Sequence, residues 1–345
     1  MDKVFTVVGA RPQFIKAAPV GHALKEAGLE EILAHTGQHF DALMSDVFFD
    51  ELKIERPRYN FSVNSLGHGA MTGRMLEKLE EAMLAEKPDI VLIYGDTNST
   101  VAGALAAAKL HIPVAHVEAG LRSFNRRMPE EINRVVADHL STLLFCPTRV
   151  AVENLAGEGI TKGVHAVGDV MFDTTLAAVA RARTQSRILD TLGIDPKCYA
   201  AATIHRAENT DDPERFARVV AWLEKAAEEL PIVMPTHPRT RKLMERGKVT
   251  PKGVRLIEPL GYLDMTWLAH NATAIFTDSG GLQKEAYFHR VPCVTLRDET
   301  EWVETLDAGW NRLWTSASAT TERRDIPDYG DGTSAKSIAK LLSSF

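Results

Sequence analysis

The sequence is poor in cysteine, has no long hydrophobic run and carries no excess of positive charge. Cys146, Cys198 and Cys293 lack the spacing of metal ligands and lie in or beside apolar stretches, so we expect reduced core thiols in a cytoplasmic protein. No apolar run approaches the roughly 20 residues that a membrane span requires, and we expect no signal peptide. A net charge of −6 disfavours nucleic acid or an anionic membrane as the main partner.

Two common nucleotide-binding motifs are also missing. The sequence contains neither GxGxxG, which is typical of nicotinamide cofactor sites, nor the P-loop pattern GxxxxGK[ST]. It shows no repeat of 20 to 50 residues and no low-complexity segment. What remains is an ordinary globular composition, 45% hydrophobic and 25% charged, over 345 residues, which is comfortable for two domains. We expect neither a metal nor a cofactor.

The pattern that does recur is an apolar run, a turn and an amphipathic helix, which predicts an α/β fold with mostly parallel sheets. We expect two Rossmann-like domains facing a cleft, at 1–170 and 171–330, and a C-terminal helix at 331–345 that packs back on the N-terminal domain. A long helix over 169–190 is expected to connect the domains. The strands are expected at 4–8, 31–35, 89–94, 114–117, 143–145, 164–167, 199–204, 232–235, 254–257, 274–277 and 293–296.

The segment 116–134 is unusually rich in charge. It follows an apolar strand, enters a helix at Pro129 and contains too many charged residues for a packed core: Glu118, Glu130, Glu131, Arg122, Arg126, Arg127 and Arg134. Ligands of open α/β sheets bind beyond the carboxyl ends of strands, where Glu118 and Arg122 emerge. Glu130 and Arg134 share one helix face. A solvated helix start, with acids favoured by the helix dipole, explains the pattern equally well.

Two further turns of the first half follow strands. Gly9-Ala10-Arg11-Pro12 opens a helix that carries Lys16, which favours an anion site. Asp96 follows the next buried strand, where capping the following helix is the simpler role. If Asp96 instead lies beside Glu118, the two carboxylates can share one raised pKa, as a general acid requires.

In the second half, two strands end in histidines that are followed by arginines. His205 and His237 are suited to proton transfer near neutral pH, although a strand-end histidine is often structural. The segment 277–285 combines Ser279, Gly280 and Gly281 at the start of a helix. Exposed backbone N–H groups there predict a diphosphate site, with Glu285 one turn on to accept from ribose hydroxyls. The alternative is a tight turn that needs glycine for its geometry.

Taken together, these segments resemble the non-hydrolysing UDP-N-acetylglucosamine 2-epimerases. The resemblance runs from the first strand to about Trp310 and rests on GARPQFIK (9–16), GDTNST (95–100), HVEAGLR (116–122), PEEINR (129–134), TIHRAEN (203–209) and TDSGGLQKEA (277–286). It implies a fold like that of the GT-B glycosyltransferases. It also implies catalytic positions at Asp96, Glu118, Glu130 and His205, supporting positions at Lys16 and Arg134, and UDP contacts from Arg11, Ser279, Gly280, Gly281 and Glu285. We add Arg122 and His237 as substrate-binding candidates.

The resemblance implies an isomerase that eliminates UDP to form a 2-acetamidoglucal and then adds UDP back, without metal or cofactor. It further implies a UDP-sugar substrate, a homodimer and a role in cell-surface polysaccharide synthesis. The alternatives are a hydrolysing epimerase, a glycosyltransferase on the same scaffold and a non-catalytic nucleotide-sugar sensor. A glycosyltransferase has no need of the carboxylates at 96, 118 and 130.

Some positions depart from the common family pattern. Gln13 and Lys284 stand where glutamates are usual, and Arg126 is followed by Arg127, so the site gains positive charge. With these changes, RPQFIK (11–16), RSFNRRMPEEINR (122–134) and SGGLQKEA (279–286) resemble the subgroup that epimerises UDP-2,3-diacetamido-2,3-dideoxyglucuronate, whose carboxylate a cation could pair with. The alternative is UDP-N-acetylglucosamine. The allosteric site of bacterial members is in doubt, because Gln38 matches it but Phe40 and Asp41 do not.

Overall fold

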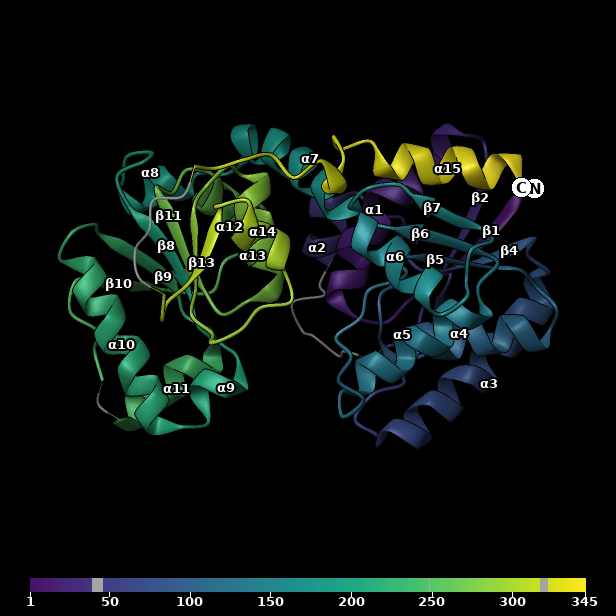
Figure 1. The fold of residues 1–345 in the computed structure, drawn as a ribbon, viewed down its shortest axis with the longest axis horizontal. Helices are drawn as coiled ribbons and strands as arrows, with labels where there is room; N and C mark the ends of the chain where they lie inside the picture. Colours follow the sequence, from purple (N-terminus) through teal and green to yellow (C-terminus); the bar gives the residue numbers. More distant parts are fainter. Residues whose placement is uncertain (39–45, 248, 317–321) are drawn as a thin grey trace. The chain divides into compact units, whose positions relative to one another are not determined.

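The computed structural model describes residues 1–38, 46–247, 249–316 and 322–345. The chain divides into two compact units, here called unit 1 (residues 1–174 and 327–345) and unit 2 (residues 175–326). Each unit holds a sheet flanked by helices, as Figure 1 shows. All strand pairings in both sheets are parallel, so the α/β class and the two Rossmann-like folds are confirmed.

The unit 1 sheet has seven strands in the order β3-β2-β1-β4-β5-β6-β7. Its middle strands are runs of valine, isoleucine and leucine that are buried throughout, as expected for a parallel sheet covered on both faces. The strands are β1 (Lys3–Val8), β2 (Glu30–His35), β3 (Tyr59–Asn60), β4 (Ile90–Tyr94), β5 (Val114–Val117), β6 (Leu143–Cys146) and β7 (Val164–Ala166).

The helices of unit 1 cover both faces of this sheet. The C-terminal helix α15 lies against α1, while α3, α4 and α5 pack side by side. Their bounds are α1 (Arg11–Glu26), α2 (Asp46–Leu52), α3 (His68–Glu86), α4 (Asn98–Lys109), α5 (Pro129–Leu140), α6 (Arg149–Gly157) and α15 (Ser334–Ser344). The helix α7 (Val170–Gln185) begins in unit 1 and continues into unit 2.

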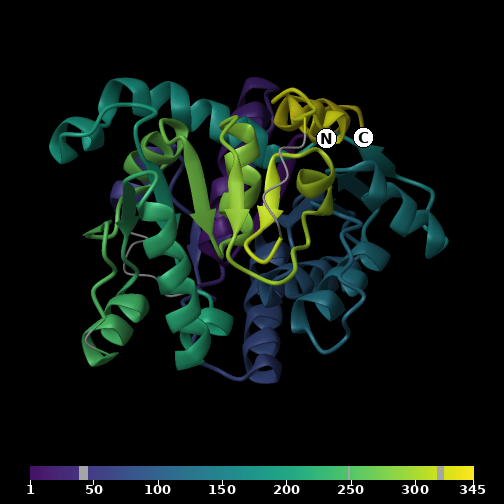
Figure 2. The same cartoon turned by 60° about the vertical axis from the view of Figure 1, so that its left-hand side comes forward.

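The unit 2 sheet has six strands in the order β10-β9-β8-β11-β12-β13, and several of them appear as broad arrows in Figure 2. The strands are β8 (Ala200–Thr203), β9 (Ile232–Pro235), β10 (Val254–Ile257), β11 (Ala274–Thr277), β12 (Cys293–Thr295) and β13 (Asn311–Leu313). The helices are α8 (Ile188–Leu192), α9 (Ala207–Thr210), α10 (Pro213–Ala227), α11 (Pro238–Gly247), α12 (Tyr262–His270), α13 (Gly280–Phe288) and α14 (Val303–Asp307). A short 3-10 helix spans Pro327–Tyr329 in unit 1.

The predicted long helix over 169–190 is wrong. It is two helices, because Ser186 leaves the helical path after Gln185. The Ser186 hydroxyl donates to Asp264 at 2.6 Å and accepts from the Ile188 N–H at 3.3 Å, which starts α8 anew. Hydroxyls that bond the local backbone compete with a continuous helix in this way.

Several short elements were not predicted from the sequence, among them β3, β13, α6, α9 and α14. The start of α6 did carry a signal, because the Thr148 hydroxyl caps it by accepting from the Ala151 N–H at 3.2 Å. The prediction of core thiols holds for Cys146 and Cys293, which are buried, and fails for Cys198, which is exposed in the turn before β8.

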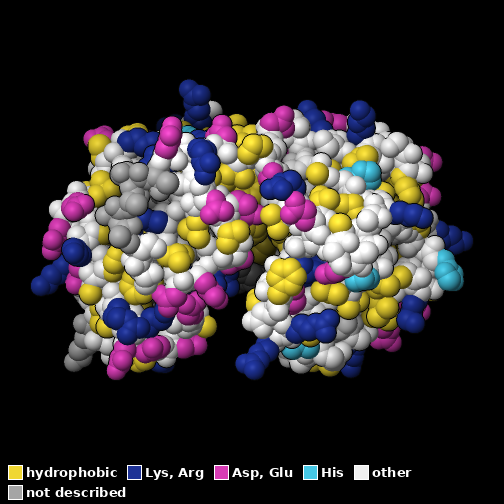
Figure 3. Space-filling model, viewed as in Figure 1, with side chains coloured by type: hydrophobic (Ala, Val, Ile, Leu, Met, Phe, Trp, Pro, Cys, Tyr) yellow, Lys and Arg dark blue, Asp and Glu magenta, His cyan; other side chains and the backbone are white. Residues whose placement is uncertain are grey.

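On the face shown in Figure 3, acidic and basic side chains are interspersed rather than gathered by sign. Among the described residues, no helix combines the length and the apolar character needed to span a membrane. The same residues contain no cluster of three or more His, Cys, Asp or Glu side chains with the geometry of a metal site.

Candidate active site

In unit 1 the chain runs from β1 outward to β2 and from β4 outward to β5 in the opposite direction. The carboxyl ends of β1 and β4 therefore form a topological switch point, where ligands of such sheets bind. Buried Gln13 joins the two strand ends. Its oxygen accepts from the Gly9 and Ala10 N–H groups at 2.7 and 3.0 Å, and its amide donates to the Tyr94 carbonyl at 2.6 Å. Gln13 is thus part of the framework of the site.

Asp96 lies directly beyond β4 and is held by α5. Arg134 forms an ion pair with the Asp96 carboxylate and donates to Glu131 at 2.8 Å, while the Asn133 amide donates to the Asp96 carbonyl at 3.0 Å. The simpler prediction, that Asp96 caps α4, is wrong, because Thr97 is the N-cap residue. About a third of the Asp96 side chain (34%) stays exposed. The carboxylate can therefore contact a ligand while it remains paired with Arg134.

Glu118 lies at the end of the neighbouring strand β5 in a strained conformation. Its φ is 71°, in the left-handed region that residues with a Cβ seldom adopt. The carboxylate pairs with Lys16 of α1 and is 8% exposed. The Gly95 turn lies next to it, since a Cβ at Gly95 would be in ordinary van der Waals contact with Glu118 Oε2, at 3.5 Å. The ends of α1, β4 and β5 thus meet around Asp96, Glu118 and their cations.

The two glutamates at the start of α5 differ sharply. Glu130 is exposed in the first turn, on the same helix face as Arg134. Glu131 is buried and holds the preceding loop by accepting from the Ser123 and Phe124 N–H groups at 2.8 and 2.9 Å. Burial opposes its ionisation, but the hydrogen bonds from Ser123, Arg134 and Phe124 outweigh burial and lower the pKa of Glu131.

Arg122 is buried as well, with 1% of its side chain exposed. Its guanidinium donates to Asp138 at 2.6 Å and to both oxygens of Glu158 at 2.7 and 2.8 Å. The expectation that the charged residues of 116–134 are too many for a packed core is therefore wrong for Arg122 and Glu131. Ion pairs and hydrogen bonds within the protein make their burial possible.

Arg11 is the first residue of α1 and is partly buried. Gln38 lies near the start of α4, where its oxygen accepts from the Ser99 N–H at 3.0 Å and from the Ser99 hydroxyl at 2.9 Å. Phe40 and Asp41 lie outside the described residues, so the doubt about an allosteric site stays a prediction.

In unit 2 the corresponding switch point lies between β8 and β11. Its organising residue is Asp278, whose side chain is fully buried. One of its oxygens accepts from the N–H groups of His205 and Arg206 and from the Asn209 amide, each at 3.0 Å. These contacts fix the turn after β8 and place the His205 ring 3.3 Å from Asp278.

His205 and His237, from the ends of β8 and β9, lie together with their ring centroids 6.0 Å apart. Burial lowers the pKa of His205. The Asp278 carboxylate acts to raise this pKa, whereas Arg206 and His237 act to lower it. His205 is therefore biased toward the neutral imidazole, which can accept a proton. Two candidates predicted from separate strands thus share one location.

The start of α13 lies at the same edge of the sheet, with Gly280 buried and Gly281 exposed. Ser279 is the N-cap residue, Gly280 and Gly281 form the first turn, and Glu285 follows one turn later. Neither glycine has a positive φ, so the alternative that the turn geometry demands glycine is not supported at these positions. At Gly281 a Cβ would meet nothing closer than Ser279 Oγ at 4.0 Å, which leaves open space above the helix N-terminus.

The three cations that distinguish this chain lie in different surroundings. Arg126 and Arg127 are exposed in the loop before α5. Lys284 is 3% exposed, and its Nζ lies 4.1 Å above the centre of the Trp302 ring. The Trp302 indole Nε1 in turn lies close to Gly280, 3.5 Å from the position that a Cβ on this glycine would occupy. Through Trp302, Lys284 therefore belongs to the residues packed around the start of α13.

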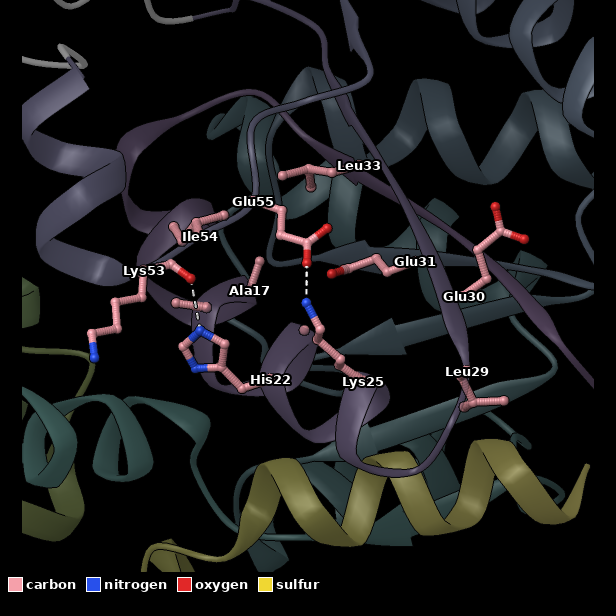
Figure 4. A pocket seen from close by; sticks show the side chains of 12 residues that line it. Ala17, His22, Lys25, Leu29, Glu30, Glu31, Leu33, Lys53, Ile54 and Glu55 are labelled. Atoms are coloured by element: carbon pink, nitrogen blue, oxygen red, sulfur yellow. Dashed lines mark hydrogen bonds and ion pairs between the residues drawn. The ribbon is translucent and has the colours of Figure 1, made fainter.

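Figure 4 shows a separate pocket of about 480 Å³ between α1, β2 and residues 53–55. None of the predicted site residues lines it. Lys25 pairs with Glu55 and His22 bonds the Lys53 carbonyl across it, as the dashed lines in Figure 4 show. It also contains Glu31, whose pKa burial raises from 4.5 to about 7 in spite of a hydrogen bond from Thr6. The pocket on its own indicates no ligand chemistry.

The fold is shared with known enzymes. A solved structure of UDP-GlcNAc 2-epimerase from Methanocaldococcus jannaschii in complex with UDP-GlcNAc and UDP is similar with a TM-score of 0.87 and 40% identity, over 99% of this chain and 100% of that one. The fold thus defines a GT-B-like enzyme of two parallel-sheet domains.

The chain belongs to the UDP-N-acetylglucosamine 2-epimerase family, whose model matches residues 22–343. It is 51% identical to a UDP-N-acetylglucosamine 2-epimerase homolog of Methanococcus maripaludis. It is 48% identical to the UDP-2,3-diacetamido-2,3-dideoxy-D-glucuronate 2-epimerase of Pseudomonas aeruginosa. Both matches cover 99% of each chain. The protein is accordingly an isomerase, a UDP-sugar 2-epimerase.

Proposed function

We propose that the protein inverts carbon 2 of a UDP-2-acetamido sugar by elimination and re-addition of UDP. A base takes the proton from carbon 2 while the bond from carbon 1 to the UDP oxygen breaks, which gives a 2-acetamidoglucal and UDP. UDP then returns to carbon 1 as an acid delivers a proton to the other face of carbon 2. Two carboxylates at neighbouring strand ends, Asp96 and Glu118, are the observation that carries this proposal.

In this proposal Asp96, Glu118 and Glu130 are the acid–base groups, and Lys16 and Arg134 hold two of them in place. Neutral His205 at the unit 2 edge assists proton transfer or leaving-group departure, with His237 beside it. Arg11 and the start of α13, with Ser279, Gly280, Gly281 and Glu285, bind UDP. Arg122 then acts by positioning Asp138 and the loop after Glu118 rather than by touching the substrate.

The test is proton NMR of candidate UDP-sugars incubated with the protein in heavy water. The expected result is an epimeric UDP-sugar that carries deuterium at carbon 2, because the elimination releases the original proton. A product that retains its original hydrogen would contradict the glycal route. Accumulation of free sugar and UDP would instead identify a hydrolysing epimerase.

We further propose UDP-2,3-diacetamido-2,3-dideoxyglucuronate as the preferred substrate. The Pseudomonas aeruginosa relative carries that name, and buried Lys284 near the start of α13 could meet the sugar's carboxylate, as could Arg126 or Arg127. A charge-assisted hydrogen bond is worth about 1.5 to 3 kcal/mol. UDP-N-acetylglucosamine is the second candidate, favoured by the Methanocaldococcus jannaschii relative of that name at 43% identity.

Side-by-side kcat/KM measurements separate the two sugars. We expect the diacetamido uronate to be turned over at least about tenfold more efficiently, the lower limit set by one such hydrogen bond. Lys284→Met should reduce that ratio if Lys284 is the responsible cation, with Arg126→Ala and Arg127→Ala as the matched alternatives. Equal or better turnover of UDP-N-acetylglucosamine by the wild type would falsify the uronate assignment.

A homodimer in the cytoplasm is also proposed, on the family resemblance. Support comes from exposed apolar side chains on the loop before α5 and on α5 itself, where Phe124 is 77% and Ile132 54% exposed. Light scattering during size-exclusion chromatography tests the dimer, and a monomer at micromolar concentration would contradict it.

A further inference from the structure

His116 contacts the turn that precedes Asp96 and was not among the predicted functional residues. It belongs to β5, two residues before Glu118, and its side chain is completely buried. Its Nδ1 lies 2.6 Å from Asp138 Oδ1, and its Nε2 lies 2.8 Å from the Gly95 carbonyl oxygen. Both ring nitrogens are therefore within hydrogen-bond distance of oxygen atoms.

The partners determine the protonation of the ring. A backbone carbonyl only accepts hydrogen bonds, so Nε2 must carry a proton. Asp138 also acts as an acceptor, since its second oxygen already receives the Gly120 N–H at 3.1 Å and the Arg122 guanidinium at 2.6 Å. Burial favours the neutral acid, but the pKa of Asp138 is lowered, and the Arg122 guanidinium beside it favours the carboxylate whatever the state of His116. With both partners accepting, His116 needs an N–H on each nitrogen.

The same contacts tie together the two turns that carry the proposed acid–base residues. The Gly95 carbonyl belongs to the peptide that joins Gly95 to Asp96, and Gly95 has a φ of 62°. Gly120 follows Glu118 by two residues and has a φ of 79°. Asp138 thus holds the Glu118 turn directly and the Asp96 turn through His116.

We propose that His116 is a buried imidazolium that, with Asp138, positions Asp96 and Glu118 for the epimerase reaction. It is a positioning residue, because its donors are used up on Asp138 and Gly95. The charges pair along a chain of contacts: buried His116 and Arg122 are cationic, buried Asp138 is anionic, and Glu158, which is 27% exposed, is the second anion, paired with Arg122. Such pairing compensates the cost of burying the imidazolium. The inference rests on the proposed catalytic role of Asp96 and Glu118.

Nitrogen-15 NMR of protein labelled at histidine tests the charge state without substrate. The expected result is a histidine with protons on both ring nitrogens at pH 7.5, whose signals are absent from His116→Gln. Asp138→Asn should convert this ring to a neutral one that is protonated at one nitrogen. A wild-type His116 that already lacks one ring proton would overturn the imidazolium.

Kinetics test the positioning role. Asp138→Asn and His116→Gln should each lower kcat at least about tenfold, since small displacements of catalytic groups are costly, while UDP affinity stays unchanged. His165→Gln, on strand β7 of the same sheet, is the matched control and should leave both unchanged. A folded His116→Gln with wild-type kcat would overturn the role. If the variants do not fold, the wild-type spectrum still shows whether a histidine ring carries protons on both nitrogens. A wild type without epimerase activity would count against the proposed function alone.

Discussion

The two sheets carry different chemistry at the same edge. At the carboxyl edge of the unit 1 sheet, Asp96 and Glu118 are side chains that protrude beyond their strands and pair with Arg134 and Lys16. At the carboxyl edge of the unit 2 sheet, the carboxylate of Asp278 is fully buried, and the exposed groups are histidines and the backbone at the start of α13.

This difference indicates a division of labour between similar folds. Ion-paired carboxylates at strand ends suit proton transfer, and Asp96 keeps about a third of its side chain exposed (34%) whereas Glu118 is 8% exposed. A helix N-terminus with glycines suits anion binding, because it offers N–H groups without a charged side chain in the way. Mutations at the two edges should therefore change different kinetic constants.

The largest effect is expected at the unit 1 edge. Asp96→Asn, Glu118→Gln and Glu130→Gln should each lower kcat by roughly 100-fold or more, the usual scale for a positioned acid or base. UDP affinity, measured by calorimetry, should stay nearly intact. Glu131→Gln is a matched contrast on the same helix, because it should destabilise the loop at Ser123 instead. Carboxylate variants with full activity would place the chemistry elsewhere.

At the unit 2 edge the expected effect is on binding. Ser279→Ala and Glu285→Ala should each weaken UDP affinity by about 1 to 3 kcal/mol, the range for losing a hydrogen bond to a charged or buried group. The Gly281→Ala substitution places a methyl group in the open space above α13, where UDP is proposed to bind. The protein itself has room for this methyl group, but UDP affinity should fall. Titration calorimetry with UDP measures all three. If these variants kept their UDP affinity and had a reduced kcat, the two edges would not differ in function.

A third prediction concerns a carboxyl group of unit 1 away from the edge. Glu31 has a folded pKa of about 7, above the 4.5 of an ordinary glutamate, so its ionisation costs stability as pH rises from about 4.5 to 7. The difference in unfolding free energy between Glu31→Gln and the wild type should therefore shift by about 2 to 3 kcal/mol in favour of the variant from pH 5 to pH 8. This range follows from about 1.36 kcal/mol for each unit of pKa shift. Urea denaturation at both pH values measures it.

Two outcomes calibrate this last prediction. Glu30→Gln, the exposed neighbour on β2, should show no comparable change with pH. Turnover by Glu31→Gln should equal that of the wild type, since the side chain faces the pocket of Figure 4 and not the strand ends. A pH-independent difference at Glu31 would mean that its carboxyl is solvated.

Much of the architecture could be read from the chain. Runs such as 232–235 and 274–277 are apolar, end in polar turns and are followed by amphipathic helices, and they became β9 and β11 as predicted. The C-terminal helix α15 also matched its prediction. Short elements such as β13 and the break at Ser186 were missed, because a few residues carry too little periodicity to be recognised.

The sequence by itself determined the parallel α/β fold, the strand ends that carry polar residues and the family motifs, because these depend on patterns over neighbouring residues. Only the tertiary structure decided which charges are exposed and which are buried. Glu130 and Glu131 are adjacent, yet one faces solvent and the other holds the loop at Ser123. Arg122 and His116 meet Asp138 because α5, which carries Asp138, packs against β5. Partners distant in the sequence set the protonation and exposure of a side chain, and no local pattern records them.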